Sequence, residues 1–191
     1  MRVIAGAYRG RKLRTLEGVE VRPTSDRLRE TLFNILAPRI RSARFLDICA
    51  GSGAVGIEAI SRGAEDAVFI ESSRAACSVI EANLSTLRID DGFRLIRRDA
   101  TPALKELAQT SAQFDIVFLD PPYASELYDQ VMNELSIGHL LEADSIVVVE
   151  HRSKHRLSSA YSNLKTYRQL KQGESALSFY EFEATPEADD L

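Results

Sequence analysis

The stretch DICAGSGAVG, residues 47–56, decides the fold. It carries Gly51, Gly53 and Gly56 in the spacing G-x-G-x-x-G, directly after the apolar run RFLDI and before a helix-like segment. Glycines at this spacing let the chain turn tightly from a strand into a helix and let a ligand approach the backbone. This order of strand, glycine loop and helix predicts the first unit of a Rossmann-like fold.

The glycine loop fits two kinds of cofactor, a nicotinamide dinucleotide and the methyl donor S-adenosylmethionine. Glu71 ends the next expected strand. Its spacing from the glycine loop along the sequence is that of an acid that accepts hydrogen bonds from ribose hydroxyls. A dehydrogenase usually needs a second domain for its substrate, and a chain of 191 residues leaves little sequence for one. The loop alone does not decide between the two cofactors.

Short apolar runs alternate with helical patterns along most of the chain. The expected strands are residues 44–48, 67–71, 93–99, 114–120 and 145–151, each followed or preceded by a helical segment. This alternation predicts an α/β fold with a mostly parallel sheet and helices on both faces. The tail, residues 164–184, predicts an antiparallel hairpin that turns at Gly173 and closes the sheet.

Acidic side chains end each of the five expected parallel strands. They are Asp47, Glu71, Asp99, Asp120 and Glu150. Ligands of open parallel sheets bind beyond the carboxyl ends of the strands, so we expect the reacting groups to lie among these residues.

The sequence DPPY, residues 120–123, follows the most apolar strand and favours one chemistry. Two prolines stiffen the backbone and offer carbonyl oxygens without N–H donors. Asp120 and the Pro121 carbonyl can then each accept one N–H of an exocyclic amino group, while Tyr123 stacks on the base that carries it. Hydride transfer has no use for this arrangement, so DPPY together with the glycine loop favours S-adenosylmethionine.

The candidate site follows from these motifs. Asp120, Pro121, Pro122 and Tyr123 are expected to hold the target amine. The expected donor-binding residues are Asp47, Ala50, Gly51, Ser52, Gly53, Gly56, Glu71, Ser72, Asp99, Ala100 and Asp120. Simpler roles stay open: Asp47 as a turn former, Asp99 as a helix N-cap and Tyr123 as core packing.

Charge is distributed unevenly along the chain. Residues 1–44 hold eleven Lys and Arg against four Asp and Glu, whereas the remainder holds 13 basic and 24 acidic residues. A basic front on an acidic body indicates a polyanion-binding segment, although a solvated charged face is the simpler explanation. We expect an extended RNA-binding segment that contributes little to donor affinity. Its expected RNA contacts are Arg9, Arg11, Lys12, Arg14, Arg22 and Arg27.

Three parts of the chain follow from these patterns. Residues 1–43 are expected to form the basic extension and a docking helix with Leu28, Leu32, Ile35 and Leu36 on its apolar face. Residues 44–184 form the catalytic domain, and residues 185–191 a frayed acidic tail. Cys49 and Cys77 have neither the number nor the spacing of a metal site or disulfide framework. We expect a cytoplasmic monomer with no membrane partner.

The same residues resemble a known family. DICAGSGAVGIEAISRGA, FLDPPY, RVIAGAYRGRKL and RPTSDRLRETLFNIL together are similar to the RsmD-type methyltransferases, and the resemblance covers nearly the whole chain. It implies a seven-stranded class I methyltransferase fold and methylation of the exocyclic N2 amine of a guanine in small-subunit (16S) ribosomal RNA, guanine 966 in the RNA. The resemblance also implies a substrate on the small ribosomal subunit or its assembly intermediate, with Arg22, Pro23 and Thr24 near the donor. Cys49 and the serines of ESSRAA, residues 71–76, depart from the family pattern.

Other functions share parts of this pattern. An adenine-N6 methyltransferase acting on RNA or DNA uses the same amine chemistry, and a protein glutamine methyltransferase also acts on a planar NH₂ group. The basic front favours a nucleic acid over a protein substrate. A noncatalytic assembly factor that keeps the fold is a further alternative, against which the intact glycine loop, Glu71 and DPPY stand.

Overall fold

The computed structural model describes residues 1–16, 25–122, 126–137 and 139–183. These residues form one sheet of eight strands in the order β3-β2-β1-β4-β5-β8-β7-β6, in which the first five are parallel and the last three antiparallel. The strands are β1 Arg44–Ile48, β2 Asp66–Ile70, β3 Phe93–Ile96, β4 Phe114–Leu119, β5 Leu141–Arg152, β6 Ala160–Tyr161, β7 Leu164–Gln172 and β8 Ser175–Phe182. The expected α/β fold is confirmed, and the two-residue β6 adds an eighth strand to the seven expected.

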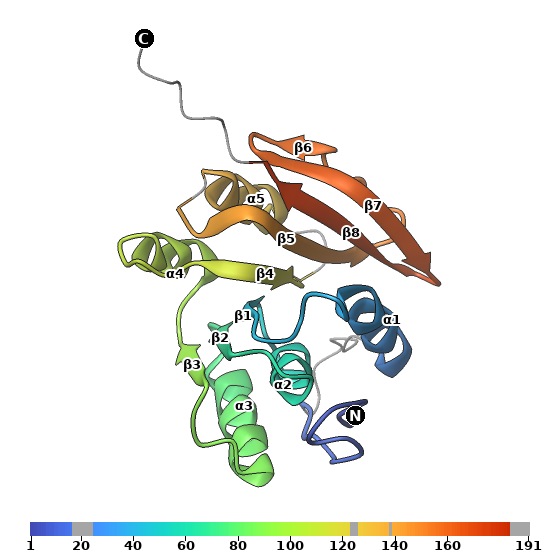
Figure 1. The fold of residues 1–191 in the computed structure, drawn as a ribbon, viewed down its shortest axis with the longest axis vertical. Helices are drawn as coiled ribbons and strands as arrows, with labels where there is room; N and C mark the ends of the chain where they lie inside the picture. Colours follow the sequence, from blue (N-terminus) through green and yellow to red (C-terminus); the bar gives the residue numbers. More distant parts are fainter. Residues whose placement is uncertain (17–24, 123–125, 138, 184–191) are drawn as a thin grey trace.

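Helices cover both faces of the sheet (Figure 1). One face packs against α1 (Asp26–Leu36), α2 (Ala54–Ser61) and α3 (Arg74–Leu87), and the other against α4 (Ala100–Leu107) and α5 (Leu127–Ser136). β4 is buried along nearly its whole length because helices cover it on both sides, which explains its almost purely apolar sequence. Among the described residues, no helix is long and apolar enough to span a membrane.

The ends of some elements differ from the sequence expectations. The third strand was expected to reach residue 99, but β3 ends at Ile96, where the chain turns toward α4. β5 begins four residues before the expected 145, since its start pairs with Phe114 across an irregular stretch of β4. The C-terminal hairpin is confirmed, with Gly173 between β7 and β8 at a φ of 64°.

Helix α1 docks on the sheet as its apolar pattern predicts. The Ser25 side chain accepts a hydrogen bond from the Leu28 N–H and caps the helix. Leu28, Leu32 and Leu36 are buried, while Ile35 is only partly covered. The helix also buries Arg29 completely, which the sequence did not lead us to expect.

The basic extension is not the extended segment that its sequence suggested. Residues 1–13 fold back on themselves as an N-terminal hairpin, with Arg2 and Lys12 bridged in antiparallel fashion and the Val3 N–H donating to the Arg11 carbonyl at 2.9 Å. Gly6 lies so close to α2 that an added Cβ would stand 1.7 Å from the Ser61 carbonyl oxygen. The hairpin therefore packs as part of the folded domain.

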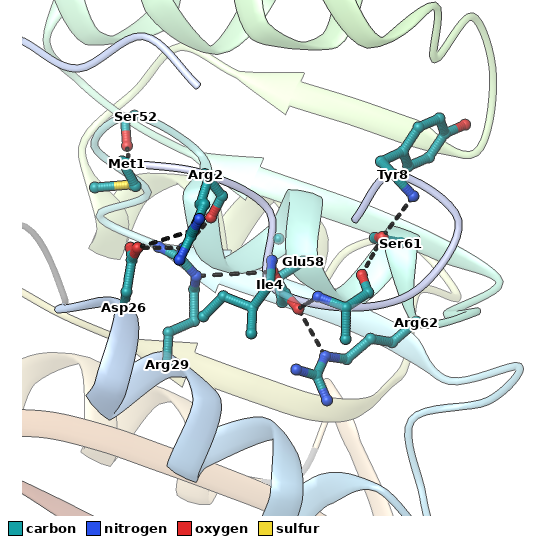
Figure 2. A network of polar contacts seen from close by, with 12 residues as sticks. Met1, Arg2, Ile4, Tyr8, Asp26, Arg29, Ser52, Glu58, Ser61 and Arg62 are labelled. Atoms are coloured by element: carbon teal, nitrogen blue, oxygen red, sulfur yellow. Dashed lines mark hydrogen bonds and ion pairs between the residues drawn. The ribbon is translucent and has the colours of Figure 1, made fainter. Parts of the chain in front are cut away.

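A buried carboxylate fastens the N-terminal hairpin to the domain, as Figure 2 shows. Glu58 of α2 is fully buried and accepts hydrogen bonds from the backbone N–H groups of Ile4 and Ala5 at 2.8 and 3.0 Å. The Arg62 Nε donates to it at 2.7 Å, and the Arg29 Nε lies 3.8 Å away. Arg29 also donates to the Arg2 carbonyl, so hairpin, α1 and α2 meet in one network.

Candidate active site

Two adjoining hollows lie at the carboxyl edge of the parallel strands. Their volumes are about 210 and 860 Å³, and both are lined by Leu16, Cys49, Gly51 and Asp120. The larger falls within the range of small-molecule sites. Of the expected site residues, the smaller hollow is lined by Asp47, Ala50, Gly51, Ser52 and Asp120, and the larger by Gly51, Glu71, Ser72, Asp99, Ala100, Asp120, Pro121 and Pro122. Arg22, Thr24 and Tyr123 lie outside the described residues.

Contacts with Asp47 and Phe69 fix the conformation of the glycine loop. The Gly56 N–H donates to Asp47 Oδ2 at 2.8 Å, which fixes the carboxylate at the start of the loop. A Cβ on Gly56 would stand 2.3 Å from the Phe69 ring, so only glycine allows α2 to lie this close to β2. Gly53, at the N-cap of α2, and Gly56 thus support the loop without lining either hollow.

Glu71 is held by backbone donors on both of its oxygens. Its Oε2 accepts from the Gly51 N–H and its Oε1 from the Ser73 N–H, each at 2.8 Å. A carboxylate oxygen can accept a second hydrogen bond, so this orientation leaves acceptor capacity toward the larger hollow. Glu71 therefore lines the larger hollow as the sequence predicted, and its contact with the ribose hydroxyls stays a prediction.

Asp99 occupies the N-cap position of α4, but its side chain makes no capping hydrogen bond. The residue is exposed and lines the larger hollow. The geometry therefore leaves this carboxylate available as an acceptor for a ligand.

Asp120 stands where the two hollows meet. Its backbone N–H donates to the Ile48 carbonyl at 3.2 Å, which ties the end of β4 to the end of β1. Pro121 and Pro122 follow it along the wall of the larger hollow. A carboxylate and a stiff backbone thus lie next to the glycine loop, as the DPPY motif required.

Four acidic side chains, Asp47, Glu71, Asp99 and Asp120, line the two hollows. Asp47, Glu71, Asp99 and Asp120 all raise the pKa of the Cys49 thiol, which burial raises further. Arg98 is the one basic residue that lines either hollow in the described part of the chain. Four carboxylates attract a cation and repel a pyrophosphate. S-adenosylmethionine bears a sulfonium and an ammonium group, so the charge of the site favours it over a dinucleotide.

Comparisons with known proteins agree with this geometry. Residues 1–181 match the family described as Conserved hypothetical protein 95. The chain is 39% identical over 189 residues to "Ribosomal RNA small subunit methyltransferase D" of Escherichia coli K12, covering 99% of this chain and 93% of that protein. It is 34% identical over 180 residues to "Putative rRNA methyltransferase YlbH" of Bacillus subtilis, covering 94% and 98%.

The chain belongs to the RsmD-type rRNA methyltransferase family. Among solved structures it is similar to "Putative methyltransferase yhhF from Escherichia coli", with a TM-score of 0.85 and 39% identity over 97% of this chain and 99% of that one. A Thermus thermophilus protein, TTHA0928, gives a TM-score of 0.82 at 32% identity over 95% and 99%.

In this RsmD-type chain, part of the N-terminal extension lines the smaller of the two hollows. Met1, Thr15 and Leu16 line the smaller hollow beside Asp47. The sequence had led us to expect that residues 1–30 contribute little to donor affinity. The extension lies against the glycine loop, and its contribution to donor affinity stays a prediction.

Asn83 of α3 connects the extension to the glycine loop. This buried amide accepts a hydrogen bond from the Arg14 N–H at 2.7 Å and donates to the Arg14 carbonyl at 3.1 Å. Its second N–H donates to the Ser52 carbonyl at 3.0 Å. One side chain thus holds both walls of the smaller hollow. The only sequence signal was a polar residue at helical spacing from Ile80 and Leu87.

Asn83→Ala is expected to weaken donor binding about tenfold, since it removes three hydrogen bonds that position the walls of the smaller hollow. Calorimetric titration with S-adenosylmethionine measures this change. Ser145→Ala is the matched control, because Ser145 is also buried and also bridges two segments, Glu142 and Phe114, away from both hollows. Equal donor affinity in the two variants would assign Asn83 a purely structural role.

Burial raises the pKa of Asp47 to about 7, and the nearby Glu71 adds to this shift. Because the folded-state pKa lies above the unfolded value of 3.8, the folded state binds the proton more tightly. The ligand-free protein is therefore expected to lose stability as the pH rises from about 4 to 7. Thermal unfolding across this range, compared with Asp47→Asn, measures it. A pH dependence that persists in Asp47→Asn would contradict the assignment to Asp47.

Two expected RNA contacts come together away from the hollows. Arg9 of the N-terminal hairpin and Arg27 of α1 line a separate hollow of about 450 Å³ together with Arg2. Arg11 donates instead to the Thr86 carbonyl at 3.2 Å, at the end of α3. The basic extension thus presents its cations along the side of the domain.

Proposed function

We propose that this chain transfers a methyl group to the exocyclic N2 amine of a guanine in small-subunit (16S) ribosomal RNA, guanine 966. Its substrate is the assembled or assembling small subunit, on which it acts as a monomer in the cytoplasm. Family membership makes the chain an S-adenosylmethionine-dependent rRNA methyltransferase. The proposal adds the atom that is methylated, the nucleotide that carries it and the ribosomal particle that serves as substrate.

The observation that carries the proposal is the place of Asp120 and Pro121 beside the donor hollows. The lone pair of an aromatic amine is delocalised into its ring, which makes the amine a poor nucleophile. When the Asp120 carboxylate and the Pro121 carbonyl each accept one N–H, the nitrogen becomes pyramidal and its lone pair turns away from the ring. Asp120 can then receive the proton that the amine loses.

The donor is held by the remaining carboxylates. Glu71 takes the ribose hydroxyls, Asp99 the adenine amino group and Asp47 the ammonium group. S-adenosylmethionine supplies a methyl group on a sulfonium, which leaves readily. Positioning therefore accounts for much of the rate, and a strong base is not required.

The target amine has to reach the edge of the sheet. The N2 atom of guanine faces the minor groove in a helix, so the base comes from a loop or is flipped out at a cost of a few kcal/mol. The cations of the extension, among them Arg9 and Arg27, bind surrounding phosphates during that step. Tyr123 stacks on the extruded base.

Labelled S-adenosylmethionine with small subunits prepared from cells without this activity tests the proposal. Digestion of the RNA to nucleosides should place the label in N2-methylguanosine. Label in N6-methyladenosine would keep the amine chemistry but support the runner-up, an adenine methyltransferase. Donor binding without any label in RNA would favour another substrate or a binding role.

A further inference from the structure

A second basic segment lies near the C-terminus of this otherwise acidic body. Residues 151–173 contain six Lys and Arg and no Asp or Glu, although the chain from residue 45 onward holds 24 acids. Lys165 forms an ion pair with Glu183, and Arg168 lies over the Phe179 ring. The other cations lie at the end of β5, on the β5–β6 connection and at the end of β7.

We define the β5–β6 basic surface as Arg152, Lys154, His155, Arg156 and Lys171, all of which are exposed. Lys171 pairs in register with Ala176 of β8, which in turn pairs with His151 of β5. Burial lowers the pKa of His151, and His155 and Lys171 lower it further, so both of these side chains lie near the same buried imidazole. The surface is therefore one patch, although its members come from two segments.

This surface lies beside the candidate active site. The His155 ring stacks on Tyr128 with centroids 4.9 Å apart, and Tyr128 is the second residue of α5. The preceding residue, Leu127, lines the larger hollow. Strands β4 and β5 pair in parallel up to Leu119 and Val149, so the chain leaves β5 at the edge where Asp120 lies.

The N-terminal hairpin has some of its cations at a greater distance. Arg11 contacts Thr86, whereas the start of α3 follows Ser73 on the wall of the larger hollow. Twelve residues of helix separate Arg74 from Thr86, which corresponds to about 18 Å. Phosphates flanking an extruded nucleotide need nearer cations, and the β5–β6 basic surface supplies them.

We propose that the β5–β6 basic surface binds phosphates of the ribosomal RNA next to the target nucleotide. The N-terminal hairpin and this surface flank the active site from opposite faces of the sheet, since the hairpin packs on α2 and the stacked His155 on α5. RNA that binds both the N-terminal hairpin and the β5–β6 basic surface presents the target nucleotide to the active site between them. The inference rests on the proposed function, because it requires an RNA substrate.

The triple variant Lys154→Gln, Arg156→Gln and Lys171→Gln tests it. Each lost phosphate contact lowers the steepness of log affinity against log salt concentration by about 0.7–0.9. For the three substitutions together we expect this steepness to fall by about 2. We also expect the Kd for protein-free 16S rRNA to rise roughly 30-fold. Donor affinity should not change. The matched control is Arg88→Gln, Arg94→Gln and Lys105→Gln, which removes the same charge from exposed positions at the C-cap of α3, on β3 and on α4.

The outcomes separate the surface from the proposed function. Equal RNA affinity and an equal salt dependence in the two triple variants would overturn the proposal. A loss of affinity for the assembled subunit without a loss for protein-free RNA would also overturn it, because the surface would then contact a ribosomal protein. If the wild-type protein bound RNA but methylated an atom other than guanine N2, the proposed function would fail while a selective loss of affinity in the test variant still supported the surface.

Discussion

Asp120→Ala is expected to reduce methyl transfer by at least about 1000-fold, because it removes an acceptor that aligns the amine and takes up its proton. Donor affinity should stay within about threefold of wild type, since the proposal assigns the ammonium, ribose and adenine contacts to Asp47, Glu71 and Asp99. Single-turnover methyl transfer and calorimetric donor titration measure the two quantities separately.

A matched control distinguishes this role from a general effect of charge. Asp129 is an exposed acid in the first turn of α5 and accepts a hydrogen bond from the Tyr161 hydroxyl at 2.7 Å, outside both hollows. Asp129→Asn should keep methyl transfer within about twofold of wild type. If Asp120→Ala lost donor affinity and turnover to the same extent, Asp120 would be a donor contact and its assignment to the amine would be wrong.

Glu58→Ala is expected to destabilise the fold by about 3–5 kcal/mol, because it leaves the buried Arg29 guanidinium without its main counter-charge. Burial already lowers the pKa of Arg29, and Glu58 is the largest influence that opposes this shift. The hairpin N–H groups of Ile4 and Ala5 lose their acceptor in the same variant. Urea unfolding measures the change, and limited trypsin digestion should cleave after Arg9 or Arg11 first.

Two further variants make this prediction specific. Glu142→Gln removes an exposed carboxylate that lies 3.3 Å from Arg44, and it should change stability by less than about 1 kcal/mol. The pair Glu58→Leu and Arg29→Met removes both buried charges and should recover much of the lost stability. A double variant no more stable than Glu58→Ala would mean that the hairpin hydrogen bonds, and not the buried charges, dominate.

The sequence predicted the fold and the carboxylates of the site because both follow from local patterns. Parallel strands bring their carboxyl ends to one edge, so most of the acids after the apolar runs gather there, whereas Glu150 is buried within β5 and lines neither hollow. Asp47, Glu71 and Asp120 line the hollows for this reason. DPPY added the chemistry, since two consecutive prolines have few roles after a buried strand.

The residues that join segments could not be found in the same way. Glu58 and Arg29 belong to different helices, and only the folded chain shows that each meets the other and the N-terminal hairpin. The hairpin itself was missed because the charge of RGRKLR suggested solvent exposure, although Gly6 and Gly10 flank a turn with positive φ at both. The basic segment 151–173 was missed because a single count over the rest of the chain, 13 basic against 24 acidic residues, averages it with acidic stretches.

The most direct measurement is a crystal structure of the protein with S-adenosylhomocysteine. The ribose hydroxyls should lie on Glu71, the ammonium group on Asp47, and the sulfur should face Asp120 across the junction of the two hollows. A ligand bound elsewhere, or a sulfur turned away from Asp120 and Pro121, would contradict the claim that this edge of the sheet transfers the methyl group to an amine.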